Sequence, residues 1–284
     1  MKKYPIKLAG KDFTFVNINS SIKGSRKKKI VIDKDNNKAF FKYQKEGYNV
    51  SEACSEKISY EIAKVLGYEC AKIELAKDYD NTLGVLNYLF IDINKFIHED
   101  AISYLNPNNE SRKKFYTITN IKKVLDNLDK SLFKDFIKIM IFDALIGEQD
   151  RHEENWGIEK IGNNYKLSPL YDNGCSLLRE FKDETFSNNY YSGRKNFNSY
   201  IEKSKTVIHK ENDGTNYKHF ELIEYLNKNY YDIVQKEIKN LSKLTDDIIE
   251  KIVQNIPDEL LTEKHKIYII EYLKRRRNII LNIK

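Results

Sequence analysis

Short apolar runs separated by polar turns occupy the first third of the chain, from Phe13 to about Leu89. Four of these runs have the length and composition of β-strands: 29–33, 38–42, 71–75 and 83–91. The polar sequence Lys-Asp-Asn-Asn at 34–37 separates the first two runs and favours a hairpin turn, because Asn and Asp tolerate turn conformations. The pattern therefore predicts a small β-sheet at the start of the chain.

One helix interrupts these strands between Ser55 and Gly67. Four apolar residues recur there at helical spacing and share one face: Ile58, Ile62, Val65 and Leu66. Gly67 is placed to end the helix, since glycine readily adopts the left-handed conformation found just past a helix C-terminus. The first part of the chain is therefore expected to combine a sheet with one helix.

The pattern becomes mostly helical beyond about Asp92. A strongly apolar helix covers 132–142 and ends near Gly147. Two short runs, 156–161 and 165–170, then flank a Gly-Asn-Asn turn and predict a β-hairpin. The segment that joins this helix to the hairpin is therefore held at both ends by regular structure.

Two further stretches complete the chain. Residues 179–216 are polar and weakly periodic, and helical patterns return from Phe220 through Asn282. We therefore expect an α+β fold with a small β-rich lobe at residues 1–91 and a larger, mostly helical lobe at residues 92–284.

Composition bounds the class of protein without identifying it. The 284 residues carry 49 Lys and Arg against 42 Asp and Glu, a formal charge of +7 that modestly favours acidic partners. The three cysteines, Cys54, Cys70 and Cys175, are widely spaced and form no Cys-x-x-Cys pair that would suggest zinc or redox chemistry. The first residues lack the apolar core of a secretory signal, and no stretch approaches the roughly 20 apolar residues of a membrane span. We expect a soluble cytoplasmic protein with reduced thiols, which leaves open export by a route that needs no signal.

The densest group of chemically active side chains lies between the apolar helix and the hairpin. Residues 147–156 read Gly-Glu-Gln-Asp-Arg-His-Glu-Glu-Asn-Trp, and Tyr-Asp-Asn-Gly follows at 171–174. Transfer of a phosphoryl group needs an acid side chain near the attacking hydroxyl and oxygen ligands for Mg²⁺. Asp150 is the candidate catalytic base, and Asn155 and Asp172 are the candidate metal ligands, because the predicted hairpin joins the last two.

Simpler interpretations exist for each of these residues taken alone. Asp150, Asn155 and Asp172 are all residue types that are common in turns. Asp150 with His152 is also a ligand pattern of some zinc hydrolases, which we weigh as a minor alternative. Arg151 suits either contact with a substrate or phosphorylated residue or simple solvation. It is the whole string with its downstream Tyr-Asp that favours phosphoryl transfer.

The string Asp-Arg-His-x-x-Asn-Trp-Gly at 150–157, with Tyr-Asp at 171–172, resembles the catalytic core of the HipA-like serine/threonine kinases. Within that family the likeness is greatest to the compact CtkA-type bacterial kinases. The resemblance implies a bilobal protein-kinase-like fold that binds ATP and Mg²⁺ between its lobes and phosphorylates Ser or Thr. It also implies that His152 belongs to the catalytic loop and supports its geometry.

The same resemblance assigns an ion pair to the small lobe. Lys42 ends a strand run, where a kinase places the lysine that neutralises the α- and β-phosphates. Ser55-Glu56 aligns with an Asn-Glu that opens the helix in the family, which makes Glu56 the expected partner of Lys42. Glu56 lies off the apolar face of the helix, so Glu52 and Glu61 remain open as alternatives.

Two nucleotide-binding segments are implied next. The loop at 17–29 contains a single glycine, and HipA-like kinases use a Ser/Gly/Lys-rich loop of this kind to cover the phosphates, although a solvated basic turn is the simpler alternative. Its candidate contacts are Ser20, Ser21 and Gly24, and Ser20, Ser21 and Ser25 are candidate autophosphorylation sites by the same resemblance. The interlobe segment 87–91 should hold the adenine, with Tyr88, Leu89 and Phe90 as its candidates.

Two basic or polar segments remain open. Residues 180–216 occupy the place of an activation or substrate-binding segment, with Thr185, Ser187 and Ser192 as conceivable phosphosites, or form an ordinary surface insertion. Arg275-Arg276-Arg277 suits a solvated helix end better than a nucleic-acid contact.

The favoured function is therefore an ATP- and Mg²⁺-dependent serine/threonine kinase with a protein substrate and autophosphorylation. A toxin or virulence role and an antitoxin or other regulatory partner are compatible with the family. Nucleic-acid binding is not expected as the primary activity, and no membrane association is expected. The rival hypotheses are a small-molecule phosphotransferase and a non-catalytic binding protein with a kinase fold.

Overall fold

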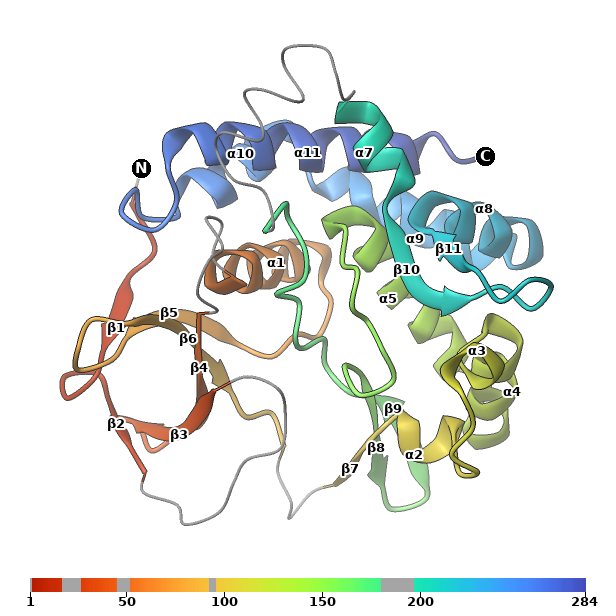
Figure 1. The fold of residues 1–284 in the computed structure, drawn as a ribbon, viewed down its shortest axis with the longest axis horizontal. Helices are drawn as coiled ribbons and strands as arrows, with labels where there is room; N and C mark the ends of the chain where they lie inside the picture. Colours follow the sequence, from red (N-terminus) through yellow and green to blue (C-terminus); the bar gives the residue numbers. More distant parts are fainter. Residues whose placement is uncertain (1, 17–26, 45–51, 92–95, 180–196) are drawn as a thin grey trace.

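The computed structural model describes residues 2–16, 27–44, 52–91, 96–179 and 197–284. It combines a curled β-sheet with a larger helical part, as expected for the predicted two-lobed architecture (Figure 1). The predicted α+β class and bilobal architecture are therefore confirmed. The predicted boundary at residue 91 adjoins residues 92–95, which lie outside the described ranges, and it stays a prediction.

The sheet has the strand order β1-β5-β6-β4-β3-β2. Its strands are β1 (Ile6–Leu8), β2 (Phe13–Phe15), β3 (Lys28–Asp33), β4 (Lys38–Tyr43), β5 (Ile73–Lys77) and β6 (Leu83–Tyr88). All neighbouring strands are antiparallel except β1 and β5, which pair in parallel. The predicted hairpin turn joins β3 to β4, and Asn36 there adopts a left-handed φ of 62°.

Alternation along β4 decides which side chains reach the helical part. Ala39 and Phe41 face a small apolar cluster on one side of the sheet. Phe40 and Lys42 therefore point to the opposite side, since successive residues of a strand alternate between faces. Helix α1 (Glu52–Leu66) covers that opposite side, so Lys42 is directed toward it.

Helix α1 packs its apolar residues, including Ile58 and Ile62, into the main core with Leu75 of the sheet. It ends as predicted, because Gly67 follows it with a left-handed φ of 74°. It begins three residues before the predicted Ser55. The sheet and α1 thus form one packed unit.

The helical part is built around α5, which spans Leu132–Ile146. Every residue from Ile139 to Ile146 is buried, as expected for a helix that is apolar on all sides. Gly147 ends the helix with a φ of 71°, and a Cβ placed there would lie 1.9 Å from the Tyr272 Oη. Glycine is therefore required at this position both by backbone conformation and by space.

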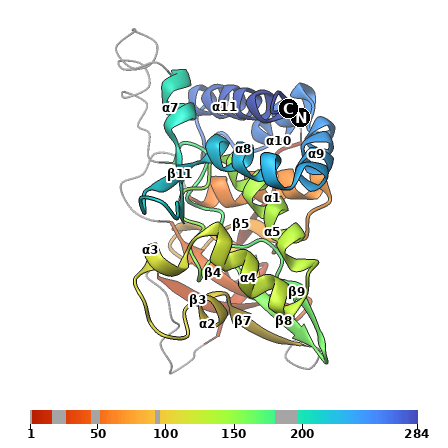
Figure 2. The same ribbon diagram turned by 90° about the vertical axis from the view of Figure 1, so that its right-hand side faces the viewer.

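Other helices complete this part of the chain. They are α2 (Ile102–Leu105), α3 (Arg112–Phe115), α4 (Ile118–Leu128), α7 (Phe197–Lys203), α8 (His219–Asn229), α9 (Tyr231–Asn240), a 3₁₀ turn at Leu241–Lys243, α10 (Asp246–Gln254) and α11 (Glu263–Leu281). Figure 2 shows α8, α9, α10 and α11 together at one end of the molecule. No helix among the described residues is long and apolar enough to cross a membrane.

The helical part also contains strands that the sequence pattern did not predict. The expected hairpin forms as β8 (Gly157–Ile161) and β9 (Asn164–Leu167), but β7 (Ile97–Asp100) pairs with β8 as a third strand. Strands β10 (Lys205–His209) and β11 (Asn216–Lys218) form a separate pair. Strand β7 reads Ile-His-Glu-Asp and is mostly exposed, so it carries no apolar alternation that would mark it as a strand.

The arginine triplet at 275–277 corrects a further expectation. Arg276 is fully buried and Arg277 is only 8% exposed, so the preferred interpretation as a solvated helix end is wrong. Arg277 donates to the Leu244 carbonyl and to Asp246. Helix α11 therefore buries more than one face, and long cationic side chains form part of the buried surface.

Candidate active site

The loop after α5 is closed by hydrogen bonds around Asp150. The Asp150 amide donates to Glu148 Oε1 at 2.8 Å. Its carbonyl accepts from the His152 amide at 2.8 Å and from Asn155 Nδ2 at 2.6 Å. The five-residue spacing between Asp150 and Asn155 thus has a structural reason, because the Asn side chain closes the loop on which both residues lie.

Arg151 is buried, so the solvated role considered for it from sequence is wrong, and its guanidinium binds groups of the protein itself. Its guanidinium forms an ion pair with Asp143 on α5, with Nη2 2.9 Å from Asp143 Oδ1. Its Nη1 donates to the carbonyls of Asn155 at 2.9 Å and Tyr171 at 2.6 Å. One nitrogen therefore ties the loop that carries Asn155 to the segment that carries Asp172.

Two buried carboxyl groups lie beside this guanidinium. Burial raises the pKa of Asp143, and the adjacent Arg151 charge opposes that rise. Burial also raises the pKa of Glu148 to about 8, again against the Arg151 charge. Burial therefore favours the neutral form of Glu148, and its Oε1 accepts the Asp150 amide hydrogen.

Asp172 follows the β8–β9 hairpin and has a left-handed φ of 53°. Such a conformation costs free energy for a residue with a side chain, and it is concentrated at functional sites. Asp172 Oδ1 lies 3.3 Å from Lys42 Nζ, and Glu56 Oε1 lies at the same distance from that nitrogen. The structure therefore brings Lys42 between two carboxylates, one from α1 and one from the hairpin.

The alternatives to Glu56 lie elsewhere. Glu61 pairs with Lys57 at 2.7 Å, and Glu52 pairs with Arg179. Of the three candidates it is Glu56 that contacts Lys42, and its Oε2 also accepts the Asn173 amide at 3.3 Å.

Helix α1 has a second buried face that is polar. Glu52, Ser55, Glu56 and Ser59 follow the helical spacing i, i+3, i+4, i+7, and all four are buried. Ser55 Oγ donates to the Ser176 carbonyl at 3.2 Å, and Ser59 Oγ lies 3.5 Å from the Ser176 hydroxyl. This polar face docks α1 on the residues that follow Asp172, which explains why apolar periodicity alone did not select Glu56.

A divalent cation fits the donor chemistry of Asn155 and Asp172. The Asn155 amide nitrogen is used within the loop, which leaves Oδ1 as its metal-binding atom. An amide oxygen and a carboxylate are hard ligands that suit Mg²⁺, with phosphate oxygens and waters as the remaining ligands. No cluster of three or more His, Cys, Asp or Glu side chains that could hold a metal by itself occurs among the described residues.

His152 lies in the loop, where its amide donates to the Asp150 carbonyl. Its Nδ1 accepts the Glu154 amide at 3.2 Å. Cys175, by contrast, places its Sγ 3.6 Å from Asp150 Oδ2. No sequence signal connected this cysteine with the loop, and no disulfide joins the three cysteines.

The three residues predicted to hold the adenine, Tyr88, Leu89 and Phe90, do not all face the site. Tyr88 points away from Lys42: its hydroxyl donates to Glu74, and its amide donates to the Lys72 carbonyl. The Leu89 amide donates to the Lys38 carbonyl and so continues the strand pairing. Only Phe90 is brought to the site, where its ring lies 5.7 Å from that of Tyr171, the residue before Asp172.

Two residues of the predicted nucleotide-binding segments 17–29 and 87–91 share the Lys42 side of the sheet, although neither was singled out as a candidate. Asn87 is cross-strand partner to Phe40 and is buried. Lys28 is cross-strand partner to Lys42, and burial followed by the Lys42 charge lowers the pKa of Lys28. Cross-strand partners share a face of the sheet, and this rule together with the β3–β4 register identifies Lys28.

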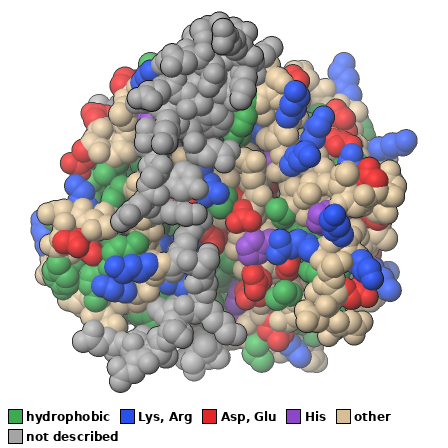
Figure 3. Space-filling model, in the orientation of Figure 1, with side chains coloured by type: hydrophobic (Ala, Val, Ile, Leu, Met, Phe, Trp, Pro, Cys, Tyr) green, Lys and Arg blue, Asp and Glu red, His purple; other side chains and the backbone are tan. Residues whose placement is uncertain are grey.

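Several predicted residues lie outside the described ranges and stay predictions. They are Ser20, Ser21, Gly24, Ser25, Thr185, Ser187 and Ser192. In the view of Figure 3, acidic and histidine side chains gather near the middle of the face, beside the residues drawn in grey.

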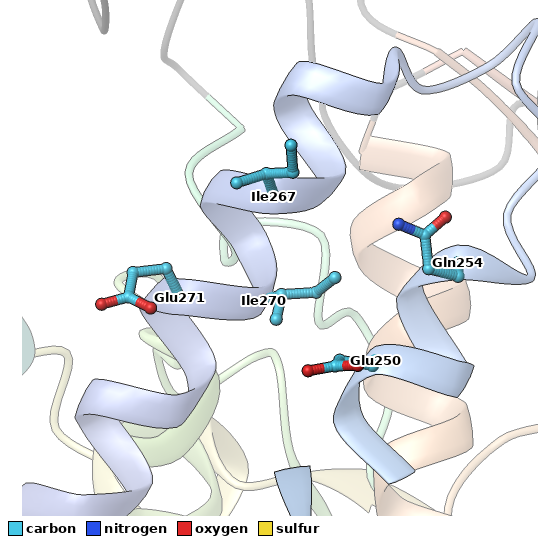
Figure 4. Close-up of a pocket in the computed structure, with 5 residues that line it drawn as sticks. All are labelled: Glu250, Gln254, Ile267, Ile270 and Glu271. Carbon is cyan, nitrogen blue, oxygen red and sulfur yellow. The ribbon is translucent and has the colours of Figure 1, made fainter. Parts of the chain in front are cut away.

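A pocket between α10 and α11 is separate from these groups. Figure 4 shows its lining residues on the two helices: Glu250, Gln254, Ile267, Ile270 and Glu271. Each polar member has a partner on these helices or next to them, with Glu250 2.6 Å from Lys274, Gln254 2.7 Å from Glu263, and Glu271 2.5 Å from Arg275. It contributes no side chain to the site around Asp150.

Comparison with known proteins gives the same architecture. The serine/threonine-protein kinase CtkA of Helicobacter pylori is 24% identical over 174 residues, which cover 58% of this chain and 52% of that protein. The match thus spans about half the length of this curated relative. The crystal structure of the H. pylori proinflammatory kinase CtkA superposes with a TM-score of 0.76 at 20% identity, covering 90% of this chain and 92% of that one.

A second solved structure is the HipA–HipB toxin–antitoxin complex with operator DNA from Shewanella oneidensis. It matches with a TM-score of 0.60 at 12% identity, covering 92% of this chain and 64% of that one. At these identities the two structural matches establish the fold. The HipA-like C-terminal domain model matches residues 20–260, and this chain therefore belongs to the HipA-like C-terminal domain family.

Proposed function

We propose that this protein is an ATP- and Mg²⁺-dependent kinase that phosphorylates Ser or Thr in protein substrates. The observation that carries the proposal is the position of Lys42, 3.3 Å from both Glu56 and Asp172. A lysine held between a helix carboxylate and the acid after a hairpin is the arrangement with which kinases neutralise ATP phosphates.

In the proposed mechanism, Lys42 contacts phosphate oxygens and Lys28 adds a second positive charge beside it. Asn155 and Asp172 would hold Mg²⁺, which supplies charge neutralisation at the transferred phosphoryl group when bound. Asp150 orients the acceptor hydroxyl and takes its proton. The Arg151 guanidinium keeps the two segments in register, so that the acid and the metal ligands act on the same phosphoryl group.

Family membership supports a protein substrate and suggests a regulatory partner. CtkA is named as a serine/threonine-protein kinase, and the S. oneidensis HipA was solved with HipB. We extend both properties to this chain as part of the proposal, together with autophosphorylation at Ser20, Ser21 or Ser25.

The test is transfer from γ-labelled ATP with Mg²⁺ by the purified protein and its Asp150→Asn variant, followed by phosphosite mapping on the protein itself and on a lysate. Label on Ser or Thr in the wild type alone supports the proposal. Label on a metabolite fraction without protein label would favour a small-molecule phosphotransferase. Binding of Mg²⁺-ATP with no transfer to either class of acceptor would leave a non-catalytic kinase-fold protein.

A further inference from the structure

The buried Arg276 takes part in a hydrogen-bonded chain that ends on the catalytic loop. Its Nη1 donates to Ser204 Oγ at 2.7 Å, and that hydroxyl lies 3.0 Å from His219 Nδ1. His219 Nε2 lies 2.7 Å from the Glu148 carbonyl oxygen. All four residues are buried, and they come from α11, the residue after α7, the first turn of α8 and the loop just after α5. The chain therefore joins parts of the helical lobe that are distant in sequence to a point two residues before Asp150.

The positions of the hydrogens follow from the partners. A carbonyl only accepts, so His219 must carry its proton on Nε2 to bond Glu148. Burial, and then the Arg276 charge, lower the pKa of His219 to about 3, so the ring is neutral and Nδ1 is an acceptor. The Ser204 hydroxyl then donates to Nδ1 while its oxygen accepts from Arg276.

One competing acceptor lies near this hydroxyl. Ser204 Oγ is also 2.9 Å from the Ile201 carbonyl. That carbonyl has a second donor in Arg276 Nη1, at 3.2 Å, whereas Nδ1 of a neutral His219 depends on the hydroxyl. Donation from Ser204 to His219 is therefore the arrangement that pairs both ring nitrogens.

Glu148 is held at both its main chain and its side chain. Its carbonyl accepts from His219, and its carboxyl oxygen accepts the Asp150 amide hydrogen. The peptide groups on either side of Glu148 have little freedom to move. Gly147 packs closely against the Tyr272 side chain, and the Asp150 carbonyl accepts a hydrogen bond from the Asn155 side chain. A shift of the Glu148 carbonyl would therefore be passed on to Asp150.

We propose that His219 is a positioning residue for phosphoryl transfer, which holds the Glu148 carbonyl so that Asp150 is directed at the acceptor hydroxyl. This inference rests on the proposed function. The Glu148 carbonyl sets the tautomer of His219, Ser204 and Arg276 support it from the other ring nitrogen, and His219 itself touches neither nucleotide nor substrate.

The test compares His219→Leu, which removes the donor, with His219→Gln, whose amide can still donate from a similar distance. His209→Leu is the matched control, because His209 is also buried and binds the Gly214 carbonyl rather than the loop. Three quantities are measured for each folded variant: kcat for transfer to the peptide mapped from the wild type, Kd for Mg²⁺-ATP, and amide hydrogen exchange across residues 147–151.

For His219→Leu, kcat falls by about 10- to 100-fold, as expected when a catalytic group is misplaced, while the Kd for Mg²⁺-ATP changes less than about twofold. Amide hydrogen exchange at 147–151 becomes faster. His219→Gln restores most of the kcat and most of the protection from exchange, and His209→Leu resembles the wild type. Equal kcat in His219→Leu and wild type would overturn the inference, as would a parallel loss in the His209 control. A wild type that transfers to nothing would instead refute the proposed function. In that case, unchanged exchange at residues 147–151 in His219→Leu would also refute the proposal that His219 holds the Glu148 carbonyl. Faster exchange would support that structural role.

Discussion

Replacement of Arg151 by Met tests whether the buried guanidinium organises the site. The variant leaves the Asp143 carboxylate buried without its partner and removes donors from the carbonyls of Asn155 and Tyr171. Removing one member of a buried pair costs about 3–5 kcal/mol of unfolding free energy, a large part of the about 5–15 kcal/mol available to a folded domain. We therefore expect a folded but strongly destabilised protein.

The loss should depend on pH in a defined direction. Burial already raises the pKa of Asp143, and without Arg151 nothing described here opposes that rise. A group whose folded pKa exceeds its unfolded value of about 3.9 stabilises the fold at low pH and loses that contribution as the pH rises. The variant should therefore lose more unfolding free energy, relative to wild type, near pH 8 than near pH 5, as measured by urea denaturation at each pH.

The double variant Asp143→Leu with Arg151→Met is the control. It removes the unpaired charge, so it should regain at least about 2 kcal/mol over the single variant and lose the part of the pH dependence that comes from Asp143. Recovery should stay incomplete, because the carbonyls of Asn155 and Tyr171 still lack a donor. A single variant that loses less than about 1 kcal/mol, or a double variant that is no more stable than the single one, would refute this account of Arg151.

Three further changes follow from single contacts. Lys42→Met should lower kcat/KM for transfer by about 100-fold or more, and Glu56→Gln by less, in the same labelled-ATP assay. Gly147→Ala should cost about 1–3 kcal/mol in denaturation, because its Cβ meets the Tyr272 hydroxyl, and adding Tyr272→Phe should recover part of the loss. Glu148→Gln should gain stability relative to wild type as the pH rises from about 4 toward 8, because the raised pKa of Glu148 means that its contribution is present at low pH and is lost on ionisation. If the difference in unfolding free energy between Glu148→Gln and wild type stays constant across that range, the raised pKa of Glu148 is contradicted.

Local sequence signals were sufficient where the chemistry lies on contiguous elements. The apolar helix, its terminal Gly147 and the hairpin at 157–167 could all be predicted, since each depends on period and turn residues within a short window. The spacing from Asp150 to Asn155 and on to Asp172 follows from those elements. The fold class was correct for the same reason.

What sequence could not supply is the environment of charged residues. Arg151 and Arg276 look like solvated side chains in a chain so rich in charge, and only tertiary packing shows that both are buried. The polar face of α1 is a partial exception. Its members at 52, 55, 56 and 59 share one helical face, so a search for polar as well as apolar periodicity would have favoured Glu56 over Glu61.

These missed residues have a common physical cause. The loop that carries Asp150 starts from a helix whose last turns are fully buried, and several of its residues are buried, so its peptide groups cannot all bond to one another or to water. Arg151 satisfies carbonyls on one side of the loop, and His219 satisfies the Glu148 carbonyl on the other. A flexible solvated loop would need no such donors, but it could not hold an acid within hydrogen-bond reach of an acceptor hydroxyl. The buried cations and the neutral histidine are therefore the expected cost of holding the proposed catalytic loop against the interior, where their hydrogen bonds restrict its geometry.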